Sequence, residues 1–194
     1  MKIDNAGFQI HCHQIGDGAA QYGLDVLEKL WIKNGPRDRR PSFAHCQWIR
    51  EADKKRMADL GVISIFSDYW MAADDYYWDL YLPFVGRKRA DTMYPLKSLF
   101  DHGVNIAVHS DFYVSKPDPL YAIYSGMTRN ISKREFNERY SESKKYRRSI
   151  DPKENYTYGE VGPLSPLKER ASLDSMLYAS TMGGARSLFL ENEI

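Results

Sequence analysis

Short apolar runs alternate with longer amphipathic stretches over most of the chain. Four runs bounded by turn residues predict strands at residues 7–13, 42–46, 62–66 and 104–108. Stretches that repeat apolar positions at helical spacing predict helices at residues 17–34, 51–60, 95–103, 119–129 and 172–190. Strands and helices that alternate in this way predict an α/β fold, with a parallel sheet covered by helices.

Two segments depart from this rhythm. Residues 67–93 are aromatic and acidic, and they predict a long loop with a helical turn around residues 76–82. Residues 131–170 are polar, charged and interrupted by prolines, which indicates an insertion or a mobile loop. A length of 194 residues is enough for one sizeable core, so residues 1–194 are expected to form a single domain.

Composition argues against several classes of function. The net charge of +1 gives no sign of a surface for nucleic acid or for a membrane. No apolar run approaches the ~18 residues of a spanning helix, and the N-terminus lacks the apolar core of a signal peptide. The two cysteines provide no disulfide framework, so we expect a cytoplasmic protein. No glycine-rich dinucleotide motif or Walker loop follows any predicted strand, which disfavours nucleotide binding.

Three residues with metal-binding side chains stand at the ends of predicted strands: His13, His45 and Asp111. The carboxyl ends of parallel strands open on one side of a sheet, where the sites of β/α folds form. Two imidazoles and a carboxylate there predict a divalent metal site, with zinc as the leading candidate. Each residue also has a structural interpretation, because His45 could bond a core carbonyl and Asp111 could cap the next helix.

Sequence blocks around these residues follow a recognisable order. They are residues 13–19 (HQIGDGA), 43–47 (FAHCQ), 94–104 (YPLKSLFDHGV), 110–114 (SDFYV) with 118–120 (DPL), and 128–129 (TR) with the terminal helix. In this order and spacing the chain resembles the amidohydrolase superfamily, in particular its family-3, YtcJ-like metal-dependent hydrolases. The resemblance covers nearly the whole chain, apart from residues 67–90 and 131–165.

The resemblance implies the C-terminal half of a (β/α)8 TIM barrel, with about four parallel β-α units. Barrel strands 1–4 and the family's β-sandwich domain would then be missing. His13 and His45 match the metal ligands of barrel strands 5 and 6. Asp111 matches the strand 8 aspartate, which binds metal and carries protons as a catalytic residue. His11 has no ligand role in this correspondence, although alternate residues of a strand share a face and His11 would lie beside His13.

The activity implied is metal-dependent hydrolysis of an amide- or formamide-type C–N bond in a small molecule, by an enzyme or a fragment of one. Tyr69 and Trp70 of the aromatic loop are candidates for substrate binding. So is His109, which replaces the glycine that usually precedes the Ser-Asp pair. The alternative is a catalytically inactive half-barrel that binds metal or associates with itself. A complete flavodoxin-like domain would require the strand-end histidines to be accidental.

Four β-α units cannot close a barrel, and they would leave two parallel edges exposed. We therefore expect either a homodimer or a separate N-terminal half that completes the site. A different assignment takes His11-Cys12-His13 as the metal pair of barrel strand 1. Gly16 and Asp17 directly after it, and Asp111 only four strands later, argue against that assignment.

Overall fold

Four parallel strands form the sheet of this computed structural model, which describes residues 1–142, 157–159 and 161–193. The strands lie side by side in chain order: β1 (His11–Gln14), β2 (Ser42–His45), β3 (Ile63–Phe66) and β4 (Asn105–Val108). All four were predicted, although β1 is shorter than residues 7–13. The α/β class is confirmed, and parallel strands in this order agree with a partial TIM barrel.

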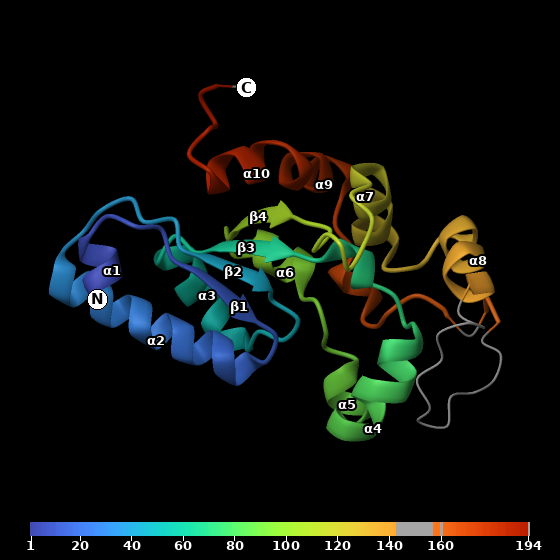
Figure 1. Cartoon of the computed structure of the whole chain (residues 1–194). Helices are drawn as coiled ribbons and strands as arrows, with labels where there is room; N and C mark the ends of the chain where they lie inside the picture. Colours follow the sequence, from blue (N-terminus) through green and yellow to red (C-terminus); the bar gives the residue numbers. More distant parts are fainter. Residues whose placement is uncertain (143–156, 160, 194) are drawn as a thin grey trace.

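Helices connect consecutive strands, as parallel neighbours require (Figure 1). α2 (Asp17–Asn34) joins β1 to β2, and α3 (Glu51–Asp59) joins β2 to β3. The buried apolar residues of α2 recur at helical spacing: Ala20, Leu24, Leu27 and Leu30. α2 ends at Gly35, whose φ of 75° lies in the left-handed region that favours glycine.

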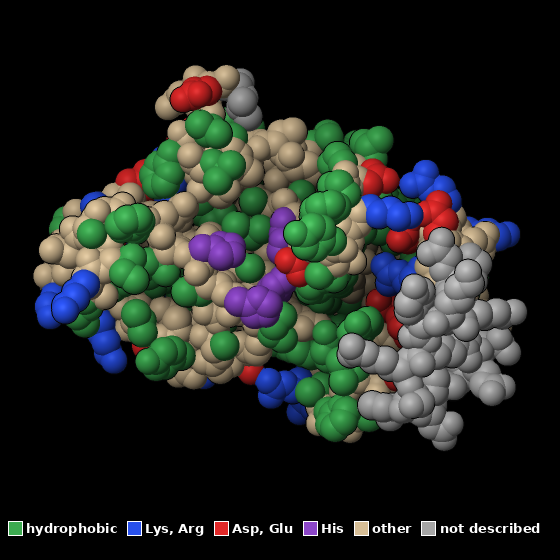
Figure 2. All heavy atoms as spheres, viewed as in Figure 1, with side chains coloured by type: hydrophobic (Ala, Val, Ile, Leu, Met, Phe, Trp, Pro, Cys, Tyr) green, Lys and Arg blue, Asp and Glu red, His purple; other side chains and the backbone are tan. Residues whose placement is uncertain are grey.

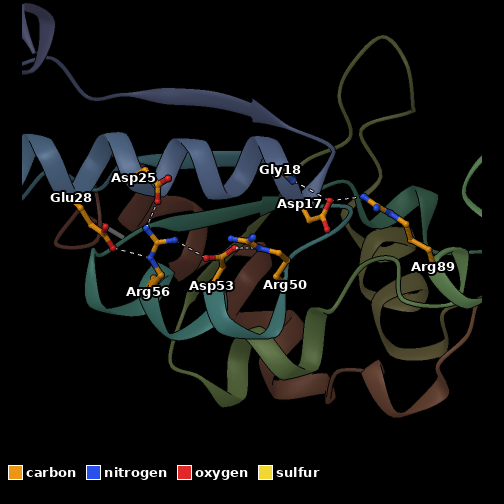
Figure 3. A network of polar contacts seen from close by, with 8 residues as sticks. All are labelled: Asp17, Gly18, Asp25, Glu28, Arg50, Asp53, Arg56 and Arg89. Carbon is orange, nitrogen blue, oxygen red and sulfur yellow. Dashed lines mark hydrogen bonds and ion pairs between the residues drawn. The ribbon is translucent and has the colours of Figure 1, made fainter.

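An ion-pair network fastens α3 to α2 (Figure 3). Arg56 of α3 donates to Asp25 at 2.6 Å and to Glu28 at 2.8 Å, both on α2. Arg56 also donates to Asp53 at 2.7 Å, and Arg50 donates to the other oxygen of Asp53 at 2.7 Å. The buried Asp53 carboxylate is therefore paired at both oxygens, which compensates its loss of hydration.

The connection between β3 and β4 contains more helix than predicted. Its segments are η1 (Asp68–Trp70), η2 (Tyr76–Tyr81), α4 (Leu82–Val85), α5 (Arg87–Ala90) and α6 (Leu96–Asp101). η2 is a π-helix and confirms the helical turn expected around residues 76–82, and α6 confirms the helix expected before β4. η1, α4 and α5 fall where the sequence predicted loop. They are only three or four residues long, which is too short for a hydrophobic repeat to reveal.

The segment after β4 begins with α7 (Pro119–Thr128), as predicted. The carboxylate of Asp118 caps this helix by accepting the N–H groups of Leu120 and Tyr121. α8 (Lys133–Glu142) and η4 (Leu167–Glu169) lie within the segment expected to be an insertion or a mobile loop. That description stays a prediction, and its residues 143–156 and 160 lie outside the described residues.

The terminal helix expected at residues 172–190 is two helices, α9 (Leu173–Ser180) and α10 (Met182–Ser187). They are separated at Thr181, whose φ and ψ of −127° and −88° are not helical. Both helices lie along β4, the last strand of the sheet (Figure 1). A Cβ at Gly183 would lie 1.9 Å from the carbonyl oxygen of Ile106, so only glycine allows this approach. The prediction that both sheet edges are exposed is therefore wrong for β4.

A short N-terminal helix, α1 (Lys2–Asn5), was not predicted. It holds the buried Asp4, which accepts from Arg39 and Arg37 at 2.8 Å each. The hydrogen bond from Arg39 is the main cause that keeps the pKa of Asp4 well below its usual range. None of the helices that the structure describes is long and apolar enough to cross a membrane.

Candidate active site

The carboxyl end of each strand carries one polar side chain of a common site. His13 lies in β1, His45 ends β2, Ser67 follows β3, and His109 follows β4. Figure 2 shows histidine side chains gathered near the middle of one face of the molecule, beside an acidic side chain. This is the side of the sheet where parallel β/α folds build their sites.

His13 and His45 are in direct contact. Nε2 of His45 lies 3.0 Å from Nδ1 of His13, and the ring centroids are 4.2 Å apart. In the sheet register His13 pairs with Ala44, so a regular strand would put His45 on the opposite face. His45 instead has a φ of 72°, and this left-handed backbone turns its side chain toward His13.

Ser67 joins His45 to His109. Its Oγ lies 2.7 Å from Nδ1 of His45 and 2.8 Å from Nε2 of His109. Ser67 is fully buried, and Trp70 stacks on the His45 ring at a centroid distance of 5.1 Å. We refer to His13, His45, Ser67 and His109 as the histidine chain. Nothing in the sequence pattern distinguishes Ser67, so the sequence did not predict this residue.

Burial keeps two imidazoles of the histidine chain neutral. Burial, together with the imidazoles of His109 and His13, lowers the pKa of His45 to about 4. Burial also lowers the pKa of His109. The charge of Asp111 acts in the opposite direction on both groups without outweighing burial. The neutral imidazole is the form that binds metal ions, because one of its ring nitrogens has a free lone pair.

A cavity of about 900 Å³ is lined by Asp111 and by Trp70, whose ring stacks on His45. The four residues of the histidine chain are not part of its lining. Four aromatic side chains line the cavity, Trp70, Tyr76, Tyr81 and Tyr94, and half of its lining residues are charged. Aromatic surface combined with charged groups could hold a small polar molecule. Tyr81 and Tyr94 were not predicted, because residues far apart in the sequence form the wall only after folding.

The other residues predicted around the site have different surroundings. Tyr69 is buried against Tyr121, and its hydroxyl donates to the backbone carbonyl of Asp118 at 2.6 Å. His109 belongs to the histidine chain. His11 is exposed, and its Nδ1 lies 2.7 Å from Oγ of Ser42. Of Tyr69, Trp70 and His109, only Trp70 lines the cavity, and the substrate-binding role of all three stays a prediction.

The pair of histidines fits two positions around a metal ion. Two nitrogen ligands of one tetrahedral zinc ion lie about 3.3 Å apart, because each Zn–N bond is about 2.0–2.1 Å. The separation of 3.0 Å between His13 and His45 is close to this value. Within the described residues, however, no three His, Cys, Asp or Glu side chains gather into a metal-binding group. The assignment of His13, His45 and Asp111 together as ligands stays a prediction.

Residues 2–193 match the model of the Amidohydrolase family. The whole chain is 28% identical to Protein LONG AFTER FAR-RED 3 of Arabidopsis thaliana, of which it covers 28%. Over 142 residues it is 29% identical to YtcJ of Bacillus subtilis (strain 168), a candidate amidohydrolase, covering 73% of this chain and 26% of that protein. The chain therefore spans about a quarter of the length of the curated relatives it matches.

The fold is similar to two crystal structures of uncharacterized metal-dependent hydrolases. One is from Pyrococcus furiosus, with a TM-score of 0.65 and 21% identity. The other is from Pyrococcus horikoshii OT3, with a TM-score of 0.68 and 18% identity. Each match covers 97% of this chain and 31% of the other. These two likenesses concern the fold alone. The family match over residues 2–193 shows that the chain belongs to the amidohydrolase family.

Proposed function

We propose that the chain forms the C-terminal half of an amidohydrolase barrel that hydrolyses an amide- or formamide-type C–N bond in a small molecule. The observation that carries this proposal is the contact between His13 and His45 at the ends of adjacent strands. These imidazoles lie beside an aromatic cavity that Asp111 lines. Family membership supports hydrolysis as the class of reaction.

In this proposal His13 and His45 hold a divalent metal ion, and zinc is favoured because imidazole is one of its preferred ligands. The bound ion would supply the Lewis acidity that activates water toward a carbonyl carbon at neutral pH. Asp111 accepts a proton from the attacking water and delivers it to the nitrogen of the leaving amine. Trp70, Tyr81 and Tyr94 enclose the apolar part of the substrate and exclude water.

The proposal also includes a partner that completes the barrel, because four parallel β-α units do not close one. The described residues, which gather no group of three metal ligands, agree with a site that is completed in this way. The partner would be a separate N-terminal half that carries strands 1–4, or a second copy of this chain whose own four strands take their place. Sedimentation distinguishes them, because a compact monomer of the isolated chain excludes the second copy. The free thiols of Cys12 and Cys46 fit a cytoplasmic location for this assembly.

The decisive experiment mixes the purified chain with a fragment of the Bacillus subtilis relative that precedes the region aligned with this chain. Zinc content and hydrolysis of N-formyl and N-acyl amines are measured before and after mixing. We expect zinc to bind and turnover to appear on mixing. Asp111→Asn should abolish that turnover, whereas Asp101→Asn, which alters an exposed pair with Lys97, should leave it unchanged.

Two other outcomes of the mixing experiment contradict the proposal. Bound zinc without turnover in any combination would favour a catalytically inactive, metal-binding module. The absence of zinc from both the isolated chain and the mixture would leave the histidine chain with a structural role. Both outcomes are read directly from metal analysis and the amine assay.

A further inference from the structure

The histidine chain links all four strands of the sheet through three consecutive hydrogen bonds. They join His13 to His45, His45 to Ser67, and Ser67 to His109, at 3.0, 2.7 and 2.8 Å. Among the residues that the structure describes, Oγ of Ser67 bonds only to these two imidazoles. Each bond needs one hydrogen, and the four groups carry one hydrogen each at a pH where imidazoles are neutral.

A neutral imidazole carries one N–H and a hydroxyl carries one O–H, so each group donates at most once within these three bonds. The Ser67 oxygen could accept from both imidazoles, but its buried O–H would then have no acceptor, which is costly. With that case disfavoured, two arrangements remain. In the first arrangement His13 donates to His45, His45 donates through Nδ1 to Ser67, and Ser67 donates to His109. In the second, every donor and acceptor is exchanged, so that His109 donates to Ser67 and His45 donates through Nε2 to His13.

In both arrangements His45 and His109 are the same tautomer, because Ser67 contacts Nδ1 of His45 and Nε2 of His109. In the first arrangement His45 and His109 both carry their proton on Nδ1. In the second arrangement both carry it on Nε2. The link between the two rings is the hydroxyl of Ser67, which accepts from one imidazole only while it donates to the other.

We propose that Ser67 is a positioning residue that forces His45 and His109 into the same tautomer, so that metal binding at His45 is transmitted to His109. The metal-dependent part rests on the proposed function. A ligand nitrogen must be unprotonated, and a ligand histidine usually donates its other N–H to a neighbouring group. With a metal ion on Nε2 of His45, the hydrogen bond between His13 and His45 is lost and the proton of His45 stays on Nδ1. The remaining bonds then follow the first arrangement, in which Ser67 accepts the Nδ1–H of His45 and donates to Nε2 of His109.

The test is a set of long-range ¹H–¹⁵N correlation spectra of the histidine rings, with each signal assigned by substituting one histidine at a time. Spectra are recorded at about pH 8, above the ordinary histidine pKa of about 6.5. In the metal-free wild-type protein, His45 and His109 should be protonated on the same ring nitrogen. With one equivalent of zinc, both should be protonated on Nδ1.

Variants separate the hydroxyl of Ser67 from the packing of its side chain. In Ser67→Ala the tautomer of His109 should no longer respond to zinc, and the zinc affinity should fall by about 10- to 100-fold. Ser67→Thr keeps the hydroxyl and should restore both properties. Ser42→Ala is the matched control, because it removes the same kind of serine–imidazole bond, at His11, and should change neither property.

The outcomes distinguish this proposal from the proposed function. His45 and His109 protonated on different nitrogens would overturn the role of Ser67, and this wild-type measurement requires no variant to fold. A zinc-loaded protein with His109 protonated on Nε2 would overturn it while leaving the metal site intact. Failure to bind zinc would reject the proposed function, and the metal-free spectra would still decide whether Ser67 couples the two rings.

Discussion

The α2–α3 network and the histidine chain both join neighbouring β-α units, but they use different chemistry. In the network, Arg56 bonds three carboxylates and Asp53 accepts from two arginines, so opposite charges are paired repeatedly (Figure 3). In the histidine chain, burial lowers the pKa of His45 and His109 and removes the charge. The network gains stability from paired ions, whereas the histidine chain keeps imidazoles in their neutral form near a cavity.

This difference indicates which of the two regions serves structure. Removing one partner from a redundant ion network leaves other partners in place. His13 is exposed and His45 is buried, and their contact brings two ring nitrogens together at the carboxyl ends of β1 and β2. A ligand can reach this position from the side of His13. The single hydrogen bond between these imidazoles contributes only about 1 kcal/mol to folding, so we attribute their arrangement to binding.

The largest difference between the two regions should be in metal affinity. His13→Ala removes one of two proposed ligands from an exposed position, so zinc affinity should fall by more than about 100-fold. The free energy of unfolding should change by less than about 0.5 kcal/mol, as for most exposed substitutions. Zinc titration and urea unfolding measure the two effects.

His11→Ala is the matched control for this change. His11 lies two residues earlier, on the same face of β1, and has no proposed ligand role. The zinc affinity of the His11→Ala variant should equal that of the wild-type protein. An equal loss in both variants would show that the two histidines act alike and would remove the reason for choosing His13.

The second largest effect should be on stability and should appear only in the network. Arg56→Met breaks its hydrogen bonds to Asp25, Glu28 and Asp53, and should lower the free energy of unfolding by about 1–2 kcal/mol. Zinc affinity should stay unchanged. Lys55→Met, on the same helix, breaks only an exposed pair with Asp59 and should leave the urea midpoint as it is. Equal midpoints for the two variants would contradict the structural role of the network.

The pH dependence of stability should have opposite signs for Asp53 of the network and for Asp74, which lines the cavity. Burial works to raise the pKa of Asp53, but hydrogen bonds from Arg50 and Arg56 outweigh it and lower the pKa. In the unfolded chain the Asp53 carboxyl has a pKa of about 3.9, so it binds a proton at a higher pH there than in the folded protein. The stabilisation from its ion pairs is therefore lost as the pH falls below about 4. Near the cavity, burial raises the pKa of Asp74 to about 6 despite Arg139.

For Asp74 the folded state holds its proton at pH values where the unfolded chain has released it. Its contribution therefore falls as the pH rises from about 4 to about 6. Urea midpoints measured across the acid range check both signs. Asp53→Asn should flatten the curve below about pH 4, and Asp74→Asn should flatten it between about pH 4 and 6. If both variants flatten the curve over the same pH range, the opposite pKa shifts of Asp53 and Asp74 are contradicted.

Periodic patterns predicted the strands and the helices between them because apolar spacing is a local property. The break between α9 and α10 could not be predicted in this way, since it accompanies a contact between Gly183 and Ile106, far apart in the chain. α8 was not predicted because its sequence is mostly polar. Phe136 and Tyr140 are its residues that pack into a small apolar cluster.

The strand-end rule located His13 and His45, but it could not show how they meet. Strict alternation would have separated them onto opposite faces, and only the left-handed backbone of His45 brings the rings together. Ser67 was not predicted, because its contacts also depend on the folded structure. Its importance comes from lying between two imidazoles that are distant in sequence, and a buried serine has no local signature.

The smallest effect should come from the outermost ion pair of Figure 3, which joins Arg89 to Asp17 at the start of α2. The side chains are 49% and 31% exposed, so solvent screens the pair and Arg89→Ala should cost only a few tenths of a kcal/mol. Asp17 also interacts favourably with the N-terminus of its own helix, which remains in the variant. Urea unfolding at low and high salt measures the cost, which should vanish at high salt. A loss that persists there would instead belong to the contact of Arg89 with the Trp48 ring at 5.9 Å, and would make this position part of the packed structure.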